Sequence, residues 1–88
     1  MKLEDVKVGQ TVVDQFGNEY VVDFVGSGGD SMPIHLRLTK FVKRATVQRH
    51  GVVFDDVDDS YWIYTTAKDA KKNGTVNCIT VESIKLKK

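Results

Sequence analysis

Apolar and polar residues alternate over several short segments of this chain, and a period of two is typical of a strand with one buried face. The clearest segment is residues 34–39, in which three aliphatic residues alternate with three polar ones: Ile34, Leu36 and Leu38 against His35, Arg37 and Thr39. The pattern predicts a strand whose aliphatic side chains point into the core. Pro33 lacks an amide donor, so it is expected at the start or on the edge of that strand.

A β-hairpin is predicted over residues 11–25, with the sequence TVVDQFGNEYVVDFV. Two β-branched runs flank residues 16–18, whose Gly and Asn tolerate the positive φ that a tight loop requires. In the second run, strict alternation places Tyr20, Val22 and Phe24 on one face. We expect Tyr20 and Phe24 to belong to the core.

The segment GSGGDS at residues 26–31 is either a flexible connection or a phosphate-binding loop. Backbone N–H groups of glycine-rich loops bind phosphate when they converge on it. This segment lacks the Gly-Lys-Ser/Thr ending of a Walker loop, and it precedes a strand instead of opening a helix. We therefore favour a simple hairpin connection.

Residues 39–50 fit two structures. Read as a helix, Thr39 caps the start, Gly51 ends it, and four apolar residues follow the i, i+3, i+4, i+7 spacing: Leu38, Phe41, Val42 and Ala45. Read as a strand, the β-branched residues Val42, Thr46 and Val47 favour extended backbone. We favour an extended strand that bends, and the helix stays open as the alternative.

The last third of the chain predicts a strand, a helix and a further strand. The strand SYWIYTT at residues 60–66 carries large side chains on both faces, Trp62 and Tyr64 sharing one of them. A short helix follows near residues 67–73, because Thr66 and Asp69 have capping-box spacing and Gly74 suits the helix end. Residues 75–86 close the chain as one strand, or as two kinked near residues 82–83.

These elements predict a single domain over residues 1–88 that is mainly β, or α+β. Five or six short antiparallel strands and one short helix form a curled sheet or a small barrel. The stretch VKVGQTVVDQFGNEYVVDFVG, chiefly residues 8–26, resembles the opening of small SH3-like barrels of the KOW and Tudor kind. In those barrels a Gly-containing lead-in precedes a strand, a tight loop and a second strand ending in Gly. The resemblance implies a fold and carries over no functional residue.

Charge is nearly balanced but segregated along the chain. Thirteen basic and twelve acidic side chains give a net charge of +1 and a pI near 7.8, whereas proteins that neutralise phosphates usually have a pI above about 9. Acids dominate residues 4–30 and recur at residues 55–59, and bases dominate residues 37–49 and the end. No apolar run nears the roughly 20 residues that span a bilayer, and no signal peptide is recognisable. With one cysteine, Cys78, expected as a buried thiol, a reducing cytoplasm is the natural compartment.

Two surface patches are candidates for binding. The basic stretch offers phosphate or carboxylate contacts, with two aromatic residues for stacking: Arg37, Lys40, Lys43, Arg44 and Arg49, with Trp62 and Tyr64. The acidic patch suits a basic partner: Asp55, Asp56, Asp58 and Asp59. For both patches an ordinary solvated surface is the simplest interpretation, and the acidic one lacks the Gly and Glu of an EF-hand.

The sequence gives little support for a metal site or for a catalytic site. His35, His50 and Cys78 are scattered, without the paired spacing of a structural zinc site, so no metal or other cofactor is expected. Cys78 lies within an apolar strand, where a thiol is expected to be inert, and no catalytic residue is assigned.

The preferred hypothesis is therefore a non-enzymatic protein-interaction module that docks a partner protein through segregated charge. Small regulatory proteins of bacteria and their phages are often of this kind. The alternative is a nucleic-acid-binding small β-barrel that uses residues 37–49. Homodimerisation through a strand edge is compatible with either hypothesis.

Overall fold

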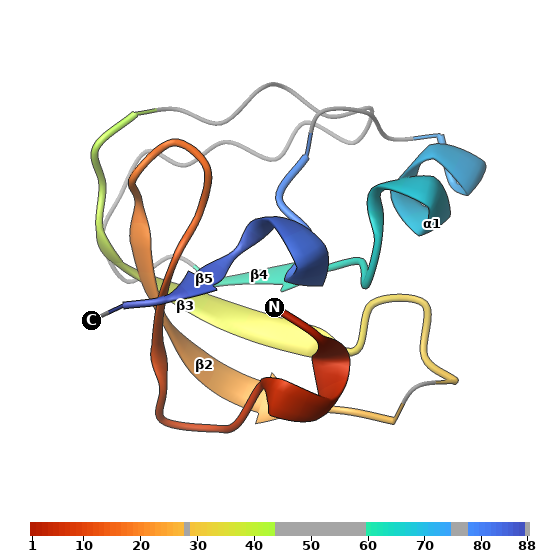
Figure 1. Ribbon diagram of the computed structural model, residues 1–88, viewed down its shortest axis with the longest axis horizontal. Helices are drawn as coiled ribbons and strands as arrows, with labels where there is room; N and C mark the ends of the chain where they lie inside the picture. Colours follow the sequence, from red (N-terminus) through yellow and green to blue (C-terminus); the bar gives the residue numbers. More distant parts are fainter. Residues whose placement is uncertain (28, 44–59, 75–77, 88) are drawn as a thin grey trace.

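The structure is a computed structural model, and it describes residues 1–27, 29–43, 60–74 and 78–87 (Figure 1). Within these ranges, five antiparallel strands form one sheet in the order β4-β3-β2-β1-β5. The strands are β1 (Thr11–Val13), β2 (Glu19–Val25), β3 (Ile34–Lys40), β4 (Ser60–Ile63) and β5 (Lys85–Leu86). The other elements are the 3₁₀ turns η1 (Leu3–Asp5) and η2 (Val81–Ser83) and the helix α1 (Ala67–Lys72). The predicted β-rich fold with one short helix is confirmed.

Within the described residues the sheet is open, but its two edges meet at one corner. Tyr64, just after β4, forms a parallel bridge with Thr80, which comes just before η2 and β5. The N–H of Val81 donates to the carbonyl of Tyr64 at 2.9 Å, and the N–H of Glu82 donates to that of Thr65 at 3.1 Å. These bonds curl the sheet without closing it into a barrel.

The core follows the predicted alternation on β3. Ile34, Leu36 and Leu38 are fully buried, and they pack with aliphatic side chains from the rest of the sheet and from η2. A second, smaller cluster holds Tyr64, Ala70 and the expected buried thiol of Cys78 beside α1. Pro33 directly precedes β3, as expected.

The β1–β2 hairpin is also confirmed, and its loop is held by a buried polar network. Gly17 adopts a φ of 90°, which a side chain would disfavour. The Asp14 carboxylate accepts the N–H of Phe16 at 2.8 Å and the N–H of Asn18 at 3.0 Å. It also accepts the Tyr20 hydroxyl at 2.5 Å. Burial, together with this carboxylate, raises the pKa of the Tyr20 phenol well above its usual range.

The expectation that Phe24 lies in the core is wrong. The ladder between β2 and β3 shifts register between Val22 and Phe24, so Asp23 is an extra, bulged residue. Val22 still faces inward opposite Leu36, but Phe24 pairs with His35 on the solvent side. Phe24 is consequently 50% exposed.

Helix α1 begins as predicted, since the Thr66 side chain accepts the N–H of Asp69 at 3.1 Å. Gly74 follows the helix with a φ of 85°, as expected for that position. A second N-terminal donor, the N–H of Ala67, is taken by the Glu82 carboxylate at 2.6 Å. This bond ties the helix to η2.

The remaining expectations concern two segments. Of the two alternatives for residues 75–86, the one with a break near residues 82–83 agrees better with the structure, because the turn η2 lies there and Lys85–Leu86 follow as a strand. The strand expected before the break is wrong for residues 78–79, and only Thr80 forms an isolated bridge. Residues 75–77 lie outside the described residues. In the 39–50 segment, β3 extends to Lys40, and residues 41–43 belong to no helix or strand. The remainder of that segment lies outside the described residues.

Candidate interaction surface

Three aromatic rings form a row on the solvent face of strands β2, β3 and β4. Phe24 pairs with His35 across β2 and β3, and His35 pairs with Trp62 across β3 and β4. The rings of Phe24 and Trp62 meet edge to face, with centroids 5.7 Å apart and planes at 69°. The His35 ring lies 4.6 Å from that of Trp62. Phe24 and Trp62 are each about half exposed, so this aromatic row is an apolar surface open to solvent.

The bulge at Asp23 creates this row. Because it adds one residue to β2, it turns Phe24 outward and leaves Val25 opposite Ile34. The carboxylate of Asp23 lies 3.4 Å from Nδ1 of His35, which places an acidic group beside the aromatic row.

A hollow of about 440 Å³ adjoins the aromatic row, lined by Phe24, Asp30, Ser31, Met32 and Trp62. Oδ2 of Asp30 accepts hydrogen bonds from the N–H of Ser27 at 3.1 Å and from its hydroxyl at 3.5 Å. Gly26 makes the arrangement possible, because a Cβ there would lie 2.5 Å from the Asp30 carboxylate and 3.2 Å from the Phe24 ring. We call this hollow the Phe24–Trp62 pocket.

The same contacts bear on the GSGGDS segment. It connects two antiparallel strands as a hairpin loop, which was the favoured interpretation. The N–H of Ser27, a donor that a phosphate would need, is taken by the Asp30 carboxylate. An acidic side chain at the loop also repels an anion, so this loop is unsuited to phosphate.

The three residues of the predicted basic stretch that the structure describes do not form one cluster. Arg37 is exposed one row beyond the aromatic row, between Val21 and Ser60. Lys40 lies at the end of β3, where its Nζ is 3.8 Å from the Glu19 carboxylate. Lys43 is exposed beyond β3. Arg44 and Arg49 lie outside the described residues, and so does the acidic patch Asp55, Asp56, Asp58 and Asp59.

The two aromatic residues chosen for stacking differ in position. Trp62 is 48% exposed and stands in the aromatic row. Tyr64 follows the end of β4, where the chain leaves the sheet edge, and its side chain is only 8% exposed. As it lies in this structure, the Tyr64 ring is packed beside α1 and does not offer a face for stacking.

A carboxylate at the opposite end of β3 is neutralised by lysines. The Glu19 carboxylate accepts a hydrogen bond from Nζ of Lys87 at 2.7 Å, and Nζ of Lys40 lies 3.8 Å from it. The hydrogen bond from Lys87 holds the pKa of the Glu19 carboxyl below its ordinary value of 4.5. Lys40 and Lys87 are therefore engaged within the molecule.

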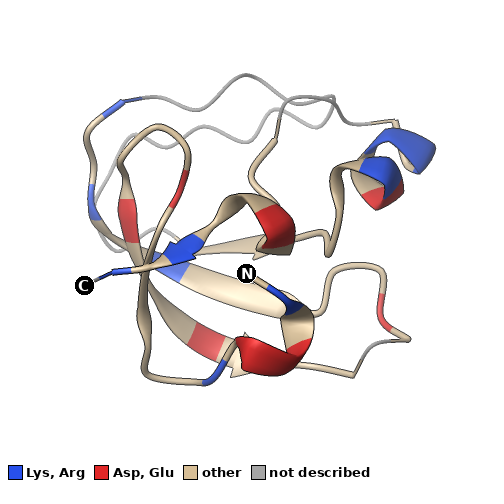
Figure 2. Ribbon diagram, in the orientation of Figure 1, with Lys and Arg blue, Asp and Glu red and all other residues tan. Residues whose placement is uncertain are grey.

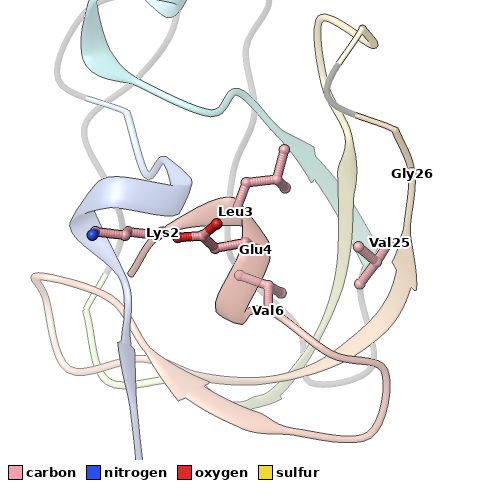
Figure 3. Close-up of a pocket in the computed structure, with 6 residues that line it drawn as sticks. All are labelled: Lys2, Leu3, Glu4, Val6, Val25 and Gly26. Atoms are coloured by element: carbon pink, nitrogen blue, oxygen red, sulfur yellow. The ribbon is translucent and has the colours of Figure 1, made fainter.

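A further hollow of about 510 Å³ lies between η1 and the end of β2, lined by Lys2, Leu3, Glu4, Val6, Val25 and Gly26. Figure 3 shows Leu3, Glu4 and Val6 on the side of η1, with Val25 across from them. The described residues that line it include neither an aromatic ring nor a buried polar side chain, so they offer little to fix the orientation of a ligand.

The sequence did not indicate Asp23, Phe24 or Asp30 as residues of a binding surface, and His35 was considered only as a metal ligand. Phe24 and Asp23 depend on a bulge that alternation does not reveal. The signal available for Asp30 was its place four residues after Gly26 in a loop of small residues. Among the described residues, no group of three or more His, Cys, Asp or Glu side chains is placed to hold a metal ion.

No protein-family model, curated protein or solved structure matches this chain. In the part of the chain that the structure describes, no helix has the length and apolar character needed to cross a bilayer.

Proposed function

We propose that this chain is a non-enzymatic protein-interaction module that docks a partner protein on the solvent face of β2, β3 and β4. The observation that carries the proposal is the exposed aromatic row of Phe24, His35 and Trp62. Tryptophan is among the residues most enriched at the energetic centres of protein interfaces, because one ring buries a large apolar area and still donates a hydrogen bond.

The charges around the aromatic row support a protein partner. Asp23 and Asp30 lie at the end of the face near the β2–β3 loop, and Arg37 lies one row beyond the aromatic residues. Figure 2 shows acidic residues on β2 and in the β2–β3 loop and basic residues on β3, and at the start of β2 the acidic Glu19 lies 3.8 Å from Lys40. A two-signed face suits a partner protein with the complementary pattern, whereas phosphates require one continuous basic surface.

We also infer that the fold is a half-open barrel of the SH3-like kind. Supporting this are the strand order, in which β1 and β2 separate the late strand β5 from β3 and β4, and the Tyr64–Thr80 bridge between the two edges. Such a barrel leaves the solvent face of β2–β4 free for a partner.

The test is capture of partner proteins from extracts with and without nuclease treatment by the tagged chain and by its Trp62→Ala variant. A hot-spot tryptophan contributes about 2 kcal/mol or more, so the variant should bind at least about 30-fold more weakly. The matched control is Leu86→Ala, since Leu86 is similarly exposed (51%) but lies in β5, at the other edge of the sheet.

A partner that Trp62→Ala loses and Leu86→Ala keeps supports the proposal. Equal capture by the two variants and the unmodified chain contradicts it. If capture instead disappears on nuclease treatment, the nucleic-acid alternative, with Arg37 and Lys43 on phosphates, takes its place.

A further inference from the structure

We propose that the Phe24–Trp62 pocket binds an arginine side chain of the partner protein. This inference rests on the proposed docking surface and goes further, because it names the chemical group that the surface recognises. Its basis is one pocket that combines two half-exposed aromatic rings with a carboxylate.

The rings provide the stacking surface. The edge-to-face contact between Phe24 and Trp62, and the His35 ring beside Trp62, cover only part of these rings, because Phe24 and Trp62 are each still about half exposed. The face of an aromatic ring is electronegative and attracts a cation placed over it, and tryptophan is the strongest of these rings.

The carboxylate of Asp30 provides the charge. Its Oδ2 is held by Ser27, and no described residue donates a hydrogen bond to its Oδ1. Asp23, beside His35, adds a second acidic group to the same face. Among the described residues, no basic side chain lines the pocket, so the electrostatic potential that these residues create favours a cation.

Arginine fits this combination better than lysine does. Its guanidinium is planar, stacks on aromatic faces, is weakly hydrated and presents several N–H donors to a carboxylate at once. An ammonium group is a compact, strongly hydrated charge that gains less from a flat ring. Arg37, one row away, orients the partner, since an acidic group of the partner is expected opposite it.

Trp62 is the only tryptophan of the chain, so its fluorescence reports on the pocket directly. The probes are three capped tripeptides with Arg, Lys or citrulline between two glycines, titrated at matched ionic strength. Citrulline has nearly the shape of arginine without its charge. We expect the Arg peptide to change Trp62 emission with a dissociation constant in the millimolar range, the Lys peptide to bind about threefold to tenfold more weakly, and the citrulline peptide to give no saturable change.

The matched variants are Asp30→Asn and Asp5→Asn. Asparagine keeps an oxygen that accepts the N–H of Ser27, so Asp30→Asn removes the charge and preserves the turn. It should weaken binding of the Arg peptide about threefold to fivefold, as expected for a partly exposed ion pair. Asp5 is likewise an exposed aspartate but lies in η1, so Asp5→Asn should leave binding unchanged.

The outcomes separate this inference from the function on which it rests. Saturable binding of the Arg peptide that Asp30→Asn weakens supports the arginine pocket. If the Arg and citrulline peptides behave alike while Trp62→Ala still loses a partner protein, the pocket assignment is overturned and the docking surface stands. If the chain alone forms a dimer that Trp62→Ala dissociates, a second copy covers the face, and the assignment to a partner's arginine is overturned as well.

Discussion

Asn18 is a fully buried amide that joins two parts of the chain. Its Oδ1 accepts the N–H groups of Val42 at 2.6 Å and Lys43 at 2.9 Å, and its Nδ2 donates to the carbonyl of Lys43 at 2.7 Å. The same Nδ2 donates to the Asp14 carboxylate at 3.0 Å. The Asn18 side chain, which lies in the β1–β2 loop, thus provides hydrogen-bond partners for the backbone groups of Val42 and Lys43, which belong to no strand.

We expect Asn18→Ala to lower the free energy of unfolding by about 2–4 kcal/mol, because several buried polar groups lose their partner at once. Chemical denaturation measures this directly. The control is Asn73→Ala, an exposed amide that donates one hydrogen bond, to the carbonyl of Asp69, and whose loss should cost below about 1 kcal/mol. Similar losses for the two variants would show that the segment after β3 does not depend on Asn18.

At the scale of the elements, the bulge in β2 determines which side chains reach the candidate surface. Asp23 is the extra residue between the pairs Val22–Leu36 and Phe24–His35. Because this extra residue interrupts the alternation, Val22 points into the core while Phe24, two positions later, points to solvent.

This arrangement predicts different outcomes for two single-residue deletions. Without Asp23, Val22 and Phe24 keep their partners in a regular ladder, and stability should change by about 1 kcal/mol or less. Without Val21, a regular ladder turns Asp23 inward opposite Leu36 and Val22 outward, which should cost at least about 3 kcal/mol. Urea denaturation of both deletion variants measures the difference. Equal costs would mean that the bulge does not set the direction of Phe24.

The bulge also explains which parts of the fold were predictable. On β3 the extra residue of the bulge lies on the partner strand, so residues 34–38 of β3 itself alternate regularly, and alternation alone predicted the buried Ile34, Leu36 and Leu38. The hairpin loop and the cap of α1 were predictable because Gly17 and Thr66 act locally. Phe24 was not, because a register shift depends on the partner strand. Tyr64 was expected on the same strand face as Trp62, but β4 ends at Ile63, so the alternation does not continue to residue 64.

The candidate surface was predictable only in part, for the same physical reason. Arg37 and Trp62 lie on regular strands, so their exposure follows from their position in the pattern. Asp30 owes its position to hydrogen bonds with Ser27 inside a loop and to the close approach that Gly26 allows. Such contacts form only when the loop is closed by β2 and β3.

At the scale of the whole molecule, Glu19 connects the beginning of β2, the end of β3 and the C-terminal residues. It is bound by Lys87 at 2.7 Å and approached by Lys40 at 3.8 Å. The backbone N–H of Lys87 also donates to the carbonyl of Thr11, which holds the residue after β5 against β1. Lys87 thus holds the end of β5 at the edge of the sheet through its side chain and its backbone, and Lys40 adds a second positive charge near Glu19.

The lowered pKa of Glu19 gives this connection a definite pH dependence. A carboxyl whose pKa is lower in the folded state stabilises the fold above its ordinary value of 4.5, and this stabilisation is lost as the pH falls through the lowered value. Glu19→Gln should therefore be less stable than the unmodified chain at pH 7, with the difference shrinking steadily below pH 4.5. Urea unfolding at a series of pH values measures it, with Glu4→Gln, an exposed acid of η1, as the control that should show no such gap. A gap for Glu19→Gln that persisted unchanged into acid would mean that Glu19 contributes through packing and not through the charges of Lys40 and Lys87.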